Sequence, residues 1–413
     1  MNVLGTINSN NIKIKYYTLI GLYRFVVTMK FPILTLFLLG EGFSIVQIGM
    51  GYTIMSITVF CSDVPLGILA DKINKKIVFI LGILIESLSS ILFKFSDRFE
   101  IMIIAFILWG IGISNFSGVL QGWVVNSSNK LKLQINQSKV FSNARVVSNL
   151  ATFFGMVISA VITTKYGFDT VFYIMFAFLL FYALLSFLII DYYSENKEDE
   201  VKHSKSEYMG FLFDKNFIFI LFFNAVLGFV YSGYAVIWMP IFEIYINLEF
   251  GEGLVNNTVV YGLSYLVSGL SLIYIINISV SIIPDLTKRI FYLRALFSIS
   301  FLLMGIFVDS TFLLVLFTFC MFIFGDLEYG SLSELNNSFF SDSNRVFGLS
   351  VLSSFERLLS SMGAFVITII YESYSATPTL MIMGIVALFP LFLLPIFRKK
   401  NNQNLESIVN EKY

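Results

Sequence analysis

Long apolar runs constrain the fold of this chain more than any other feature. Twelve such runs begin near Tyr17, Val46, Ile77, Ile101, Val140, Thr170, Phe217, Val259, Ile290, Phe312, Phe347 and Thr379. A helix that spans a bilayer needs about 20 mostly apolar residues. Within a bilayer, backbone groups must be hydrogen-bonded inside their own segment or in a closed barrel, so runs of this length favour helices. The sequence predicts an all-α integral membrane protein with twelve transmembrane helices.

Composition agrees with a membrane protein and excludes several other classes. Of 413 residues, 57% are hydrophobic and 13% are charged, whereas soluble domains carry about 25% charged residues. The formal net charge is zero, which gives no reason to expect nucleic acid as a partner. Cys61 and Cys320 lie in distant apolar runs, and the one histidine, His203, lies in a charged segment. We therefore expect no disulfide framework, no metal site and no cofactor.

Positively charged residues orient the predicted helices. They cluster before the first run and after every second run, at Lys13, Lys15, Lys72, Lys75, Lys76, Lys130, Lys132, Lys139, Lys197, Lys202, Lys205, Lys215, Lys288, Arg289, Arg294, Arg345, Arg398, Lys399 and Lys400. The alternate loops hold little more than Lys94, Arg98 and Lys165. Because lysine and arginine concentrate in cytoplasmic loops, we expect both termini to be cytoplasmic. The expected location is the plasma membrane, specifically a bacterial inner membrane.

A polar segment near the middle divides the chain into halves. Residues 191–216 form the one long hydrophilic stretch and are expected to be a cytoplasmic linker. The predicted domains are an N-terminal six-helix bundle, 1–190, and a C-terminal six-helix bundle, 217–397. Residues 398–413 are expected to be a cytoplasmic tail.

The two halves also show weak internal repetition. Pro284–Arg289 occupies in the second half the place that Ala70–Lys76 occupies in the first. Val140-Phe141 recurs as Val346-Phe347 at the start of another apolar run. A shared spacing close to half the chain is what a duplicated transporter predicts.

The loop after the second apolar run carries the most specific motif. Read as G-x-L-A-D-x-x-x-K-K, its residues are Gly67, Leu69, Ala70, Asp71, Lys75 and Lys76. This pattern resembles the loop 2-3 signature of the major facilitator superfamily of secondary transporters, although Asn74 stands where the family usually has glycine. The resemblance implies two six-helix bundles related by a pseudo-two-fold axis, with a solute site between them and transport by alternating access.

The resemblance also implies a gating role for Gly67, Asp71, Lys75 and Lys76, which would hold the cytoplasmic side closed. Gly67 allows close helix approach, and Asp71 can accept hydrogen bonds from a helix N-terminus or a basic side chain. The simpler alternative is a tight turn whose lysines only set topology. That alternative leaves Asp71 unexplained.

Ionisable side chains inside the predicted spans are candidates for function because they are costly at membrane depth. Candidates for proton coupling or ion pairing are Asp63, Asp326, Glu328, Glu356, Arg145 and Arg357. A carboxylate in a partly dry cavity can load and release a proton near neutral pH, and Glu328 ranks first for that role. The competing interpretation is a set of permanent ion pairs that hold the halves in register. Glu86 is equally open, either to a structural hydrogen bond or to transport.

Candidates for lining the solute cavity are Arg24, Lys30, Asn115, Gln121, Asn224, Tyr231 and Tyr234. Arg24 and Lys30 have an alternative, since long basic side chains can extend to the membrane interface. Asn115 and Gln121 can form helix-to-helix hydrogen bonds instead. Tyr231 and Tyr234 can belong to an interfacial aromatic belt, which we expect for Trp238 and Tyr245.

The function predicted from these features is proton-coupled export of a small amphipathic or drug-like compound. The alternatives are an importer of a sugar or organic anion and a lipid-linked glycan flippase of another fold. An enzyme would need clustered catalytic groups, and none is visible; no Walker-type loop suggests ATP as the driver. The expected partners are a small-molecule solute, H⁺ and membrane lipids, with no nucleic acid, and the expected state is a monomer.

Overall fold

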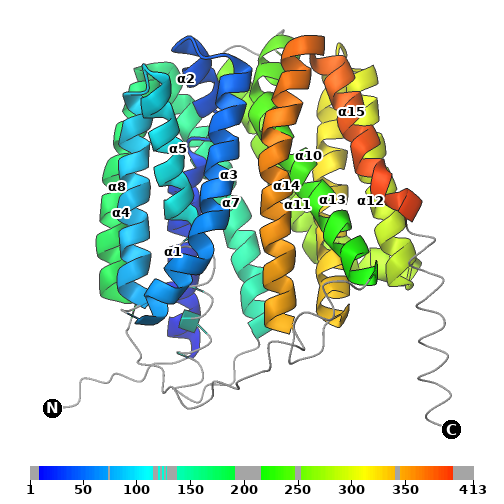
Figure 1. Ribbon diagram of the computed structural model, residues 1–413, viewed down its shortest axis with the longest axis horizontal. Helices are drawn as coiled ribbons and strands as arrows, with labels where there is room; N and C mark the ends of the chain where they lie inside the picture. The colour runs from blue at the N-terminus through cyan, green and yellow to red at the C-terminus, as the bar shows by residue number, and fades with distance from the viewer. Residues whose placement is uncertain are drawn as a thin grey trace. The chain divides into compact units, whose positions relative to one another are not determined.

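The computed structural model describes residues 9–72, 75–114, 120, 123–124, 127, 137–190, 215–246, 253–339 and 345–393. These residues form helices joined by short turns, with no strand among them (Figure 1). The predicted all-α fold is therefore confirmed. The chain divides into two compact units with the limits Met1–Lys197 plus Trp238–Leu266, and Glu198–Ile237 plus Val267–Tyr413. The predicted domain boundaries stay a prediction, and residues 191–214 of the predicted linker lie outside the described part.

Unit 1 contains the helices of the first half of the chain. They are α1 (Ser9–Thr28), α2 (Leu34–Gly40), α3 (Ile45–Lys72), α4 (Lys75–Lys94), α5 (Phe99–Ser114), α7 (Gln137–Tyr166) and α8 (Phe168–Ile189). Helix α1 packs against α7, α3 packs against α5, and α4 packs against both α5 and α8. The end of α10 (Lys215–Tyr245) and the beginning of α11 (Gly253–Ile282) also belong to this unit.

Unit 2 contains the remaining parts of α10 and α11 and the helices that follow. These are α12 (Leu286–Ile306), α13 (Thr311–Phe339), α14 (Arg345–Tyr374), α15 (Ala376–Leu388) and the short 3-10 helix η2 (Phe389–Leu393). Helix α12 packs against both α13 and α15. Asp285 caps α12, since its carboxylate accepts a hydrogen bond of 2.9 Å from the Lys288 backbone N–H.

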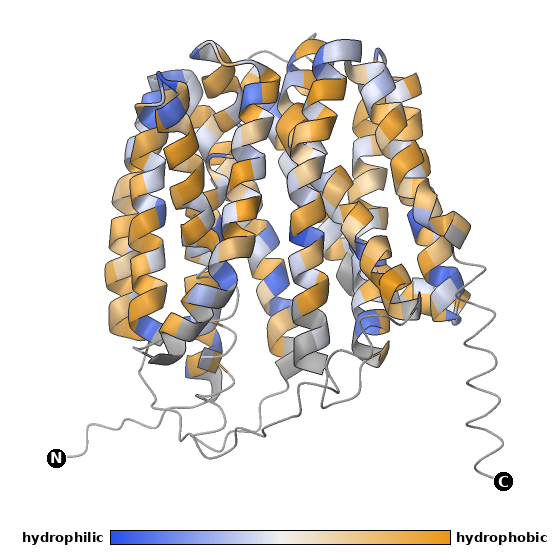
Figure 2. Cartoon of the chain, viewed as in Figure 1, coloured by the Kyte–Doolittle hydropathy of each residue, from blue (hydrophilic) through white to orange (hydrophobic). Residues whose placement is uncertain are grey.

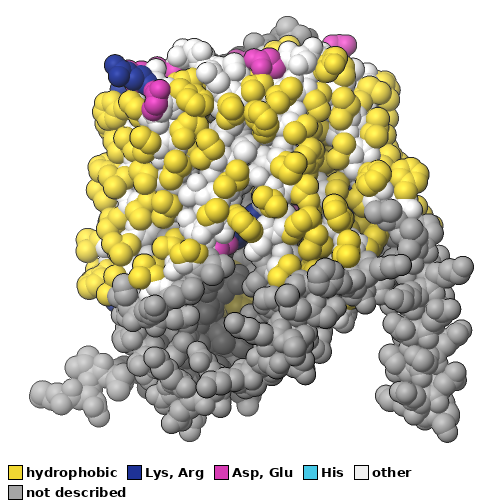
Figure 3. Space-filling view, in the orientation of Figure 1, with side chains coloured by type: hydrophobic (Ala, Val, Ile, Leu, Met, Phe, Trp, Pro, Cys, Tyr) yellow, Lys and Arg dark blue, Asp and Glu magenta, His cyan; other side chains and the backbone are white. Residues whose placement is uncertain are grey.

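The helices carry apolar surface along most of their length. Each predicted span start lies within a helix, and eight helices in the described part are long and apolar enough to cross a membrane. Helices α5 and α15 are shorter apolar helices, so a total of twelve spans stays a prediction. Most of the helical ribbon in Figure 2 is hydrophobic, and hydrophilic residues occur at helix ends and at isolated positions along the helices. Hydrophobic side chains are spread over the described part of the face in Figure 3, with charged side chains along its upper edge, as expected for a membrane-facing surface.

The first predicted span is interrupted. Helix α1 ends at Thr28, residues 29–33 form turns, and α2 begins at Leu34. Pro32 lies in this turn. Proline lacks a backbone N–H and disfavours a helical residue before it, which accounts for the break. Lys30 lies in the turn, and its carbonyl accepts a 2.8 Å hydrogen bond from the Leu34 N–H.

The contact between α1 and α7 in unit 1 is built again between α10 and α14 in unit 2. Thr28 donates to the Thr152 carbonyl over 3.5 Å, and Ser232 donates to the Ser360 carbonyl over 2.5 Å. A Cβ at Gly155 would collide with the Phe25 carbonyl, and a Cβ at Gly363 would collide with the Phe229 carbonyl. Corresponding residues differ by 204 positions between α1 and α10, and by 208 between α7 and α14. This repetition agrees with the internal duplication expected from the sequence.

Candidate functional site

Lys30 and Glu86 form a buried ion pair in unit 1. The Lys30 Nζ lies 3.4 Å from Glu86 Oε1, and Tyr23 donates a 2.8 Å hydrogen bond to Glu86 Oε2. The ammonium also lies 3.8 Å from the centroid of the Trp109 ring, a favourable cation-π contact. Lys30 therefore does not extend to a membrane interface. Its charge is neutralised inside the unit. Through Glu86 and Trp109, Lys30 connects the turn after α1 with α4 and α5.

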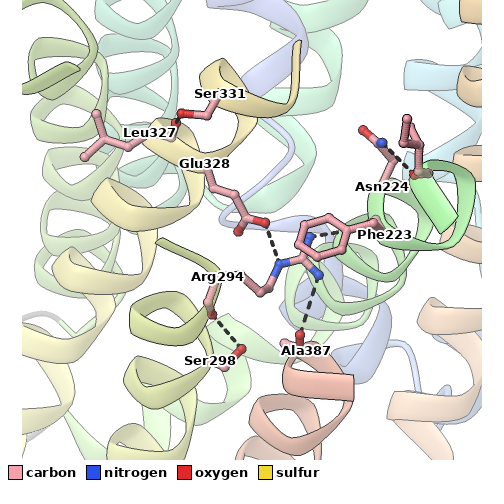
Figure 4. A network of polar contacts seen from close by, with 9 residues as sticks. Phe223, Asn224, Arg294, Ser298, Leu327, Glu328, Ser331 and Ala387 are labelled. Atoms are coloured by element: carbon pink, nitrogen blue, oxygen red, sulfur yellow. Dashed lines mark hydrogen bonds and ion pairs between the residues drawn. The ribbon is translucent and has the colours of Figure 1, made fainter. Parts of the chain in front are cut away.

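Arg294 and Glu328 form a second buried pair in unit 2, between α12 and α13. Arg294 Nε donates to Glu328 Oε1 over 2.6 Å, and its guanidinium also donates to the carbonyls of Phe223, at 2.9 Å, and Ala387, at 3.5 Å (Figure 4). The guanidinium carbon lies 4.1 Å from the centroid of the Phe223 ring. One cation thus connects α12 with α10, α13 and α15.

Sequence reasoning placed Arg294 among the cytoplasmic charges, and the structure corrects that placement. Arg294 is 0% exposed, because it lies one and a half helical turns beyond Arg289 inside α12. Arg289 is also buried, and it pairs with Glu334 over 2.6 Å. The position of Arg294 several residues inside an apolar run was the sequence signal that could have indicated its burial. Tyr23 and Trp109, which contact the other buried pair, carried no distinguishing sequence signal.

Glu356 lies in the contact between α10 and α14, where Gly228 leaves it room. A Cβ at Gly228 would stand 2.9 Å from the Glu356 Cγ. The carboxyl group is half-buried and makes no hydrogen bond or ion pair with any residue that the structure describes. The neighbouring Arg357 is half-buried and has an interaction of its own. Glu356 is thus a carboxyl group at membrane depth whose charge nothing in the described part of unit 2 balances.

Arg24 in unit 1 resembles Glu356, since it too lacks a hydrogen-bond or ion-pair partner among the described residues. It is half-buried on α1, and its Nε is buried with no hydrogen-bond partner among the described residues. Arg145 on the adjacent α7 is exposed, and Asp63 and Asp326 are half-buried; all three have interactions of their own. Among the predicted carboxylates, Glu328 forms an ion pair with Arg294.

The polar and aromatic candidates of α10 contact other residues of unit 2. Asn224 and Asn336 exchange amide hydrogen bonds of 3.2 and 3.0 Å between α10 and α13. Tyr234 is buried edge-on against Phe301, with ring centroids 5.4 Å apart. Tyr231 is half-buried, 5.3 Å from the ring of Phe297.

Trp238, by contrast, lies in unit 1, and its placement corrects the expected aromatic belt. It is 2% exposed and stacks on Tyr261 with ring centroids 3.6 Å apart. The indole is covered by this stack and by the edge of Phe242, at 5.6 Å. An aromatic side chain that is enclosed in this way cannot serve at an interface, because a belt residue must reach the headgroups.

The gating-loop candidates are only partly described. Helix α3 ends at Lys72 and α4 begins at Lys75, and the side chains of Gly67, Asp71 and Lys75 lie outside the description. Lys76 is described, and its ammonium lies 4.4 Å from the centroid of the Phe187 ring on α8. Asn115 and Gln121 also lie outside the described residues. The roles predicted for all six residues stay predictions.

No group of three His, Cys, Asp or Glu side chains suited to a metal ion occurs within the described ranges.

Comparison with known sequences gives one family. A family model described as Major Facilitator Superfamily matches residues 17–325. A curated relative, an uncharacterized MFS-type transporter named YxaM from Bacillus subtilis strain 168, is 21% identical over 409 residues. That alignment covers 95% of this chain and 97% of the relative.

Comparison with solved structures gives the same fold. The nucleoside transporter NupG superposes with a TM-score of 0.74 at 16% identity, over 94% of this chain and 99% of that chain. A mutant of NupG superposes with a TM-score of 0.78 at 14% identity, covering 94% and 100%. The human organic anion transporter MFSD10 gives a TM-score of 0.66 at 14% identity, covering 94% and 99%. At these identities the likeness shows the fold alone.

Proposed function

We propose that this chain, a transporter that belongs to the Major Facilitator Superfamily, is proton-coupled, works by alternating access and exports a small amphipathic compound. Family and fold establish transport and the multi-pass membrane setting. The coupling ion, the direction and the solute are the proposed parts.

The environment of Glu356 is the observation that supports proton coupling. Its carboxyl group is half-buried and has no hydrogen-bond or ion-pair partner among the described residues of unit 2. Burial without a counter-charge disfavours the ionised form of a carboxyl group. Binding a proton removes the charge, and releasing it restores the charge, so such a group responds to the proton concentration on the side to which it is open.

Glu328 suits a different role, although sequence reasoning ranked it first. Arg294 donates to it over 2.6 Å, and the guanidinium is fixed by two backbone carbonyls as well. This charge-assisted hydrogen bond favours the charged form of Glu328 and opposes the burial that disfavours it. We therefore assign Glu328 to a permanent ion pair and Glu356 to proton binding.

An amphipathic solute is supported by the aromatic content of the chain, 17%, because aromatic side chains bind apolar and cationic groups. The alternative is uptake of a sugar, nucleoside or organic anion. It is supported by the likeness in fold to NupG and MFSD10, which are described as a nucleoside transporter and an organic anion transporter.

The test is accumulation of fluorescent amphipathic dyes in cells that express the wild type, Glu356→Gln or Glu372→Gln. Glu372 is an exposed carboxylate on the same helix and serves as the matched control. We expect cells with the wild type or Glu372→Gln to hold less dye than empty cells. A protonophore, or Glu356→Gln, should abolish that difference.

Two results would redirect the proposal. Equal accumulation in empty and expressing cells, for anionic, neutral and cationic dyes, would exclude amphipathic export. Uptake of radiolabelled uridine, glucose or lactate that depends on expression would establish the importer instead.

A further inference from the structure

Arg24 is a cation without a hydrogen-bond or ion-pair partner in the part of unit 1 that the structure describes. Its guanidinium carries five N–H donors, yet it makes no hydrogen bond or ion pair with any described residue, and its Nε is shielded from solvent. Arg24 is half-buried, and shielding its Nε from water costs desolvation free energy that no hydrogen bond offsets. A structural role would give it a carboxylate or a set of carbonyl acceptors.

The other buried cations in the described part of the chain have such partners. Lys30 has Glu86 at 3.4 Å, Arg289 has Glu334 at 2.6 Å, and Arg294 has Glu328 at 2.6 Å. The chain therefore neutralises buried basic side chains from within wherever they only stabilise the fold. Arg24 departs from that rule.

The surroundings of Arg24 carry charge of both signs. Arg145 on the adjacent helix α7 is near enough to repel it electrostatically, whereas Glu86 on α4, which is already paired with Lys30, attracts it from within the same unit. In the predicted spans of residues 1–190 there are three cations, Arg24, Lys30 and Arg145, and two carboxylates, Asp63 and Glu86. One positive charge therefore remains in excess, whichever way these groups pair.

We infer that Arg24, assisted by Arg145, binds the anionic group of the transported solute, so that the solute is an amphipathic organic monoanion. A carboxylate or sulfonate would accept the parallel N–H donors of the guanidinium. It would also cancel the one excess positive charge of the predicted spans of residues 1–190. This inference rests on the proposed function, because it names the solute class of the same transporter.

The inference makes a prediction about the ligand-free protein. If Arg24 stabilised the fold, replacing it would lower the unfolding temperature. If Arg24 instead belongs to an anion-binding site that is empty in the ligand-free protein, Arg24→Gln removes an uncompensated charge. The unfolding temperature should then equal or exceed that of the wild type. A clear decrease would indicate a structural partner and overturn the inference.

The binding test uses the purified full-length protein in phosphatidylcholine nanodiscs, with thermal unfolding followed by tryptophan fluorescence. The probes are benzoate and benzenesulfonate, each compared with its neutral amide at equal concentration. Acids should raise the unfolding temperature of the wild type more than amides do. In Arg24→Gln, acids and amides should shift the unfolding temperature equally. In Arg24→Lys, the acids should keep a smaller advantage over the amides. Arg98→Gln removes an exposed arginine of unit 1 and should keep it in full.

Three other results of these experiments would each reject a specific part of the inference. Equal shifts from acid and amide in both pairs would overturn the anion assignment. Nanodiscs with phosphatidylglycerol separate the two sources of an anion. If that lipid alone stabilises the protein through Arg24 and removes the benzoate effect, the ligand is a headgroup and not a solute. Dye export that depends on the proton gradient but shows no Arg24-dependent anion binding would leave the proposed function standing and reject this inference alone.

Discussion

The contact between α1 and α7 in unit 1 and the contact between α10 and α14 in unit 2 share one construction but carry opposite charges. In both contacts a hydroxyl group donates a hydrogen bond to a backbone carbonyl of the other helix, and a glycine lets the backbone of a phenylalanine approach closely. By the same correspondence, Arg24 and Ser148 in unit 1 match Gly228 and Glu356 in unit 2. Within the described residues, the duplicated scaffold thus presents a cation without a hydrogen-bond or ion-pair partner in one unit and a carboxyl group without one in the other.

The buried ion pairs show the contrasting use of charge. Lys30 with Glu86 and Arg294 with Glu328 are neutralised within their own units. A charge that is matched inside the fold has a structural explanation. A charge without such a partner at membrane depth is a candidate for binding a ligand or a proton, and the proposals for Arg24 and Glu356 rest on this distinction.

The largest expected effect concerns the Arg294–Glu328 pair. Arg294→Met leaves a buried carboxylate without its cation, and breaking such a pair costs roughly 3–5 kcal/mol. We expect a large loss of folded, monodisperse protein on size-exclusion chromatography after detergent extraction. The double variant Arg294→Met with Glu328→Leu should recover most of the yield. An unchanged yield for the single variant would remove the pair from the scaffold.

A smaller effect is expected for the pair in unit 1. After Lys30→Met, Tyr23 still donates to Glu86, and the lost ion pair is longer, at 3.4 Å. The loss should be about 2–3 kcal/mol, below that of Arg294→Met. Thermal unfolding of both variants in one detergent measures the order. The reverse order would mean that Lys30 has further interactions.

Gly155→Ala and Gly363→Ala test whether the two contacts are equivalent. Each added methyl group would collide with a backbone carbonyl of the neighbouring helix, and overpacking of this kind costs about 1–3 kcal/mol. We expect similar decreases in unfolding temperature for the two variants. A decrease for one variant alone would show that only one unit depends on close packing there.

The smallest effect is expected for the amide pair. Asn336→Ala removes both hydrogen bonds that it exchanges with Asn224. Hydrogen bonds between membrane helices contribute on average about 0.6 and at most about 1.7 kcal/mol. The unfolding temperature should fall slightly while dye export continues. Loss of export without loss of stability would instead place Asn224 in the solute cavity.

The sequence predicted what depends on hydropathy and missed what depends on packing. Apolar runs located the helices because a bilayer requires long apolar segments. Pro32 was the available signal for the break after Thr28, although Pro65 and Pro240 lie within helices that continue. Membership of the family followed from a single loop, through Gly67, Asp71 and the lysines beside it.

Partners of charged residues could not be predicted, because they lie far apart in the sequence. Glu86 reaches Lys30 across 56 positions, and Glu328 reaches Arg294 across 34. Arg294 was misplaced because a basic residue near the start of a span resembles a topology signal. Glu356 and Arg24 were named as candidates, but their lack of partners in the described part is visible only in three dimensions.

Infrared difference spectroscopy of the purified protein tests the central claim, that Glu356 binds the coupling proton, most directly. Spectra recorded from alkaline to acidic pH report the carbonyl band of a carboxyl group as it becomes protonated. The wild type and Glu372→Gln should show a band that Glu356→Gln lacks. An identical band in Glu356→Gln and the wild type would contradict the account and assign the proton to another carboxyl group.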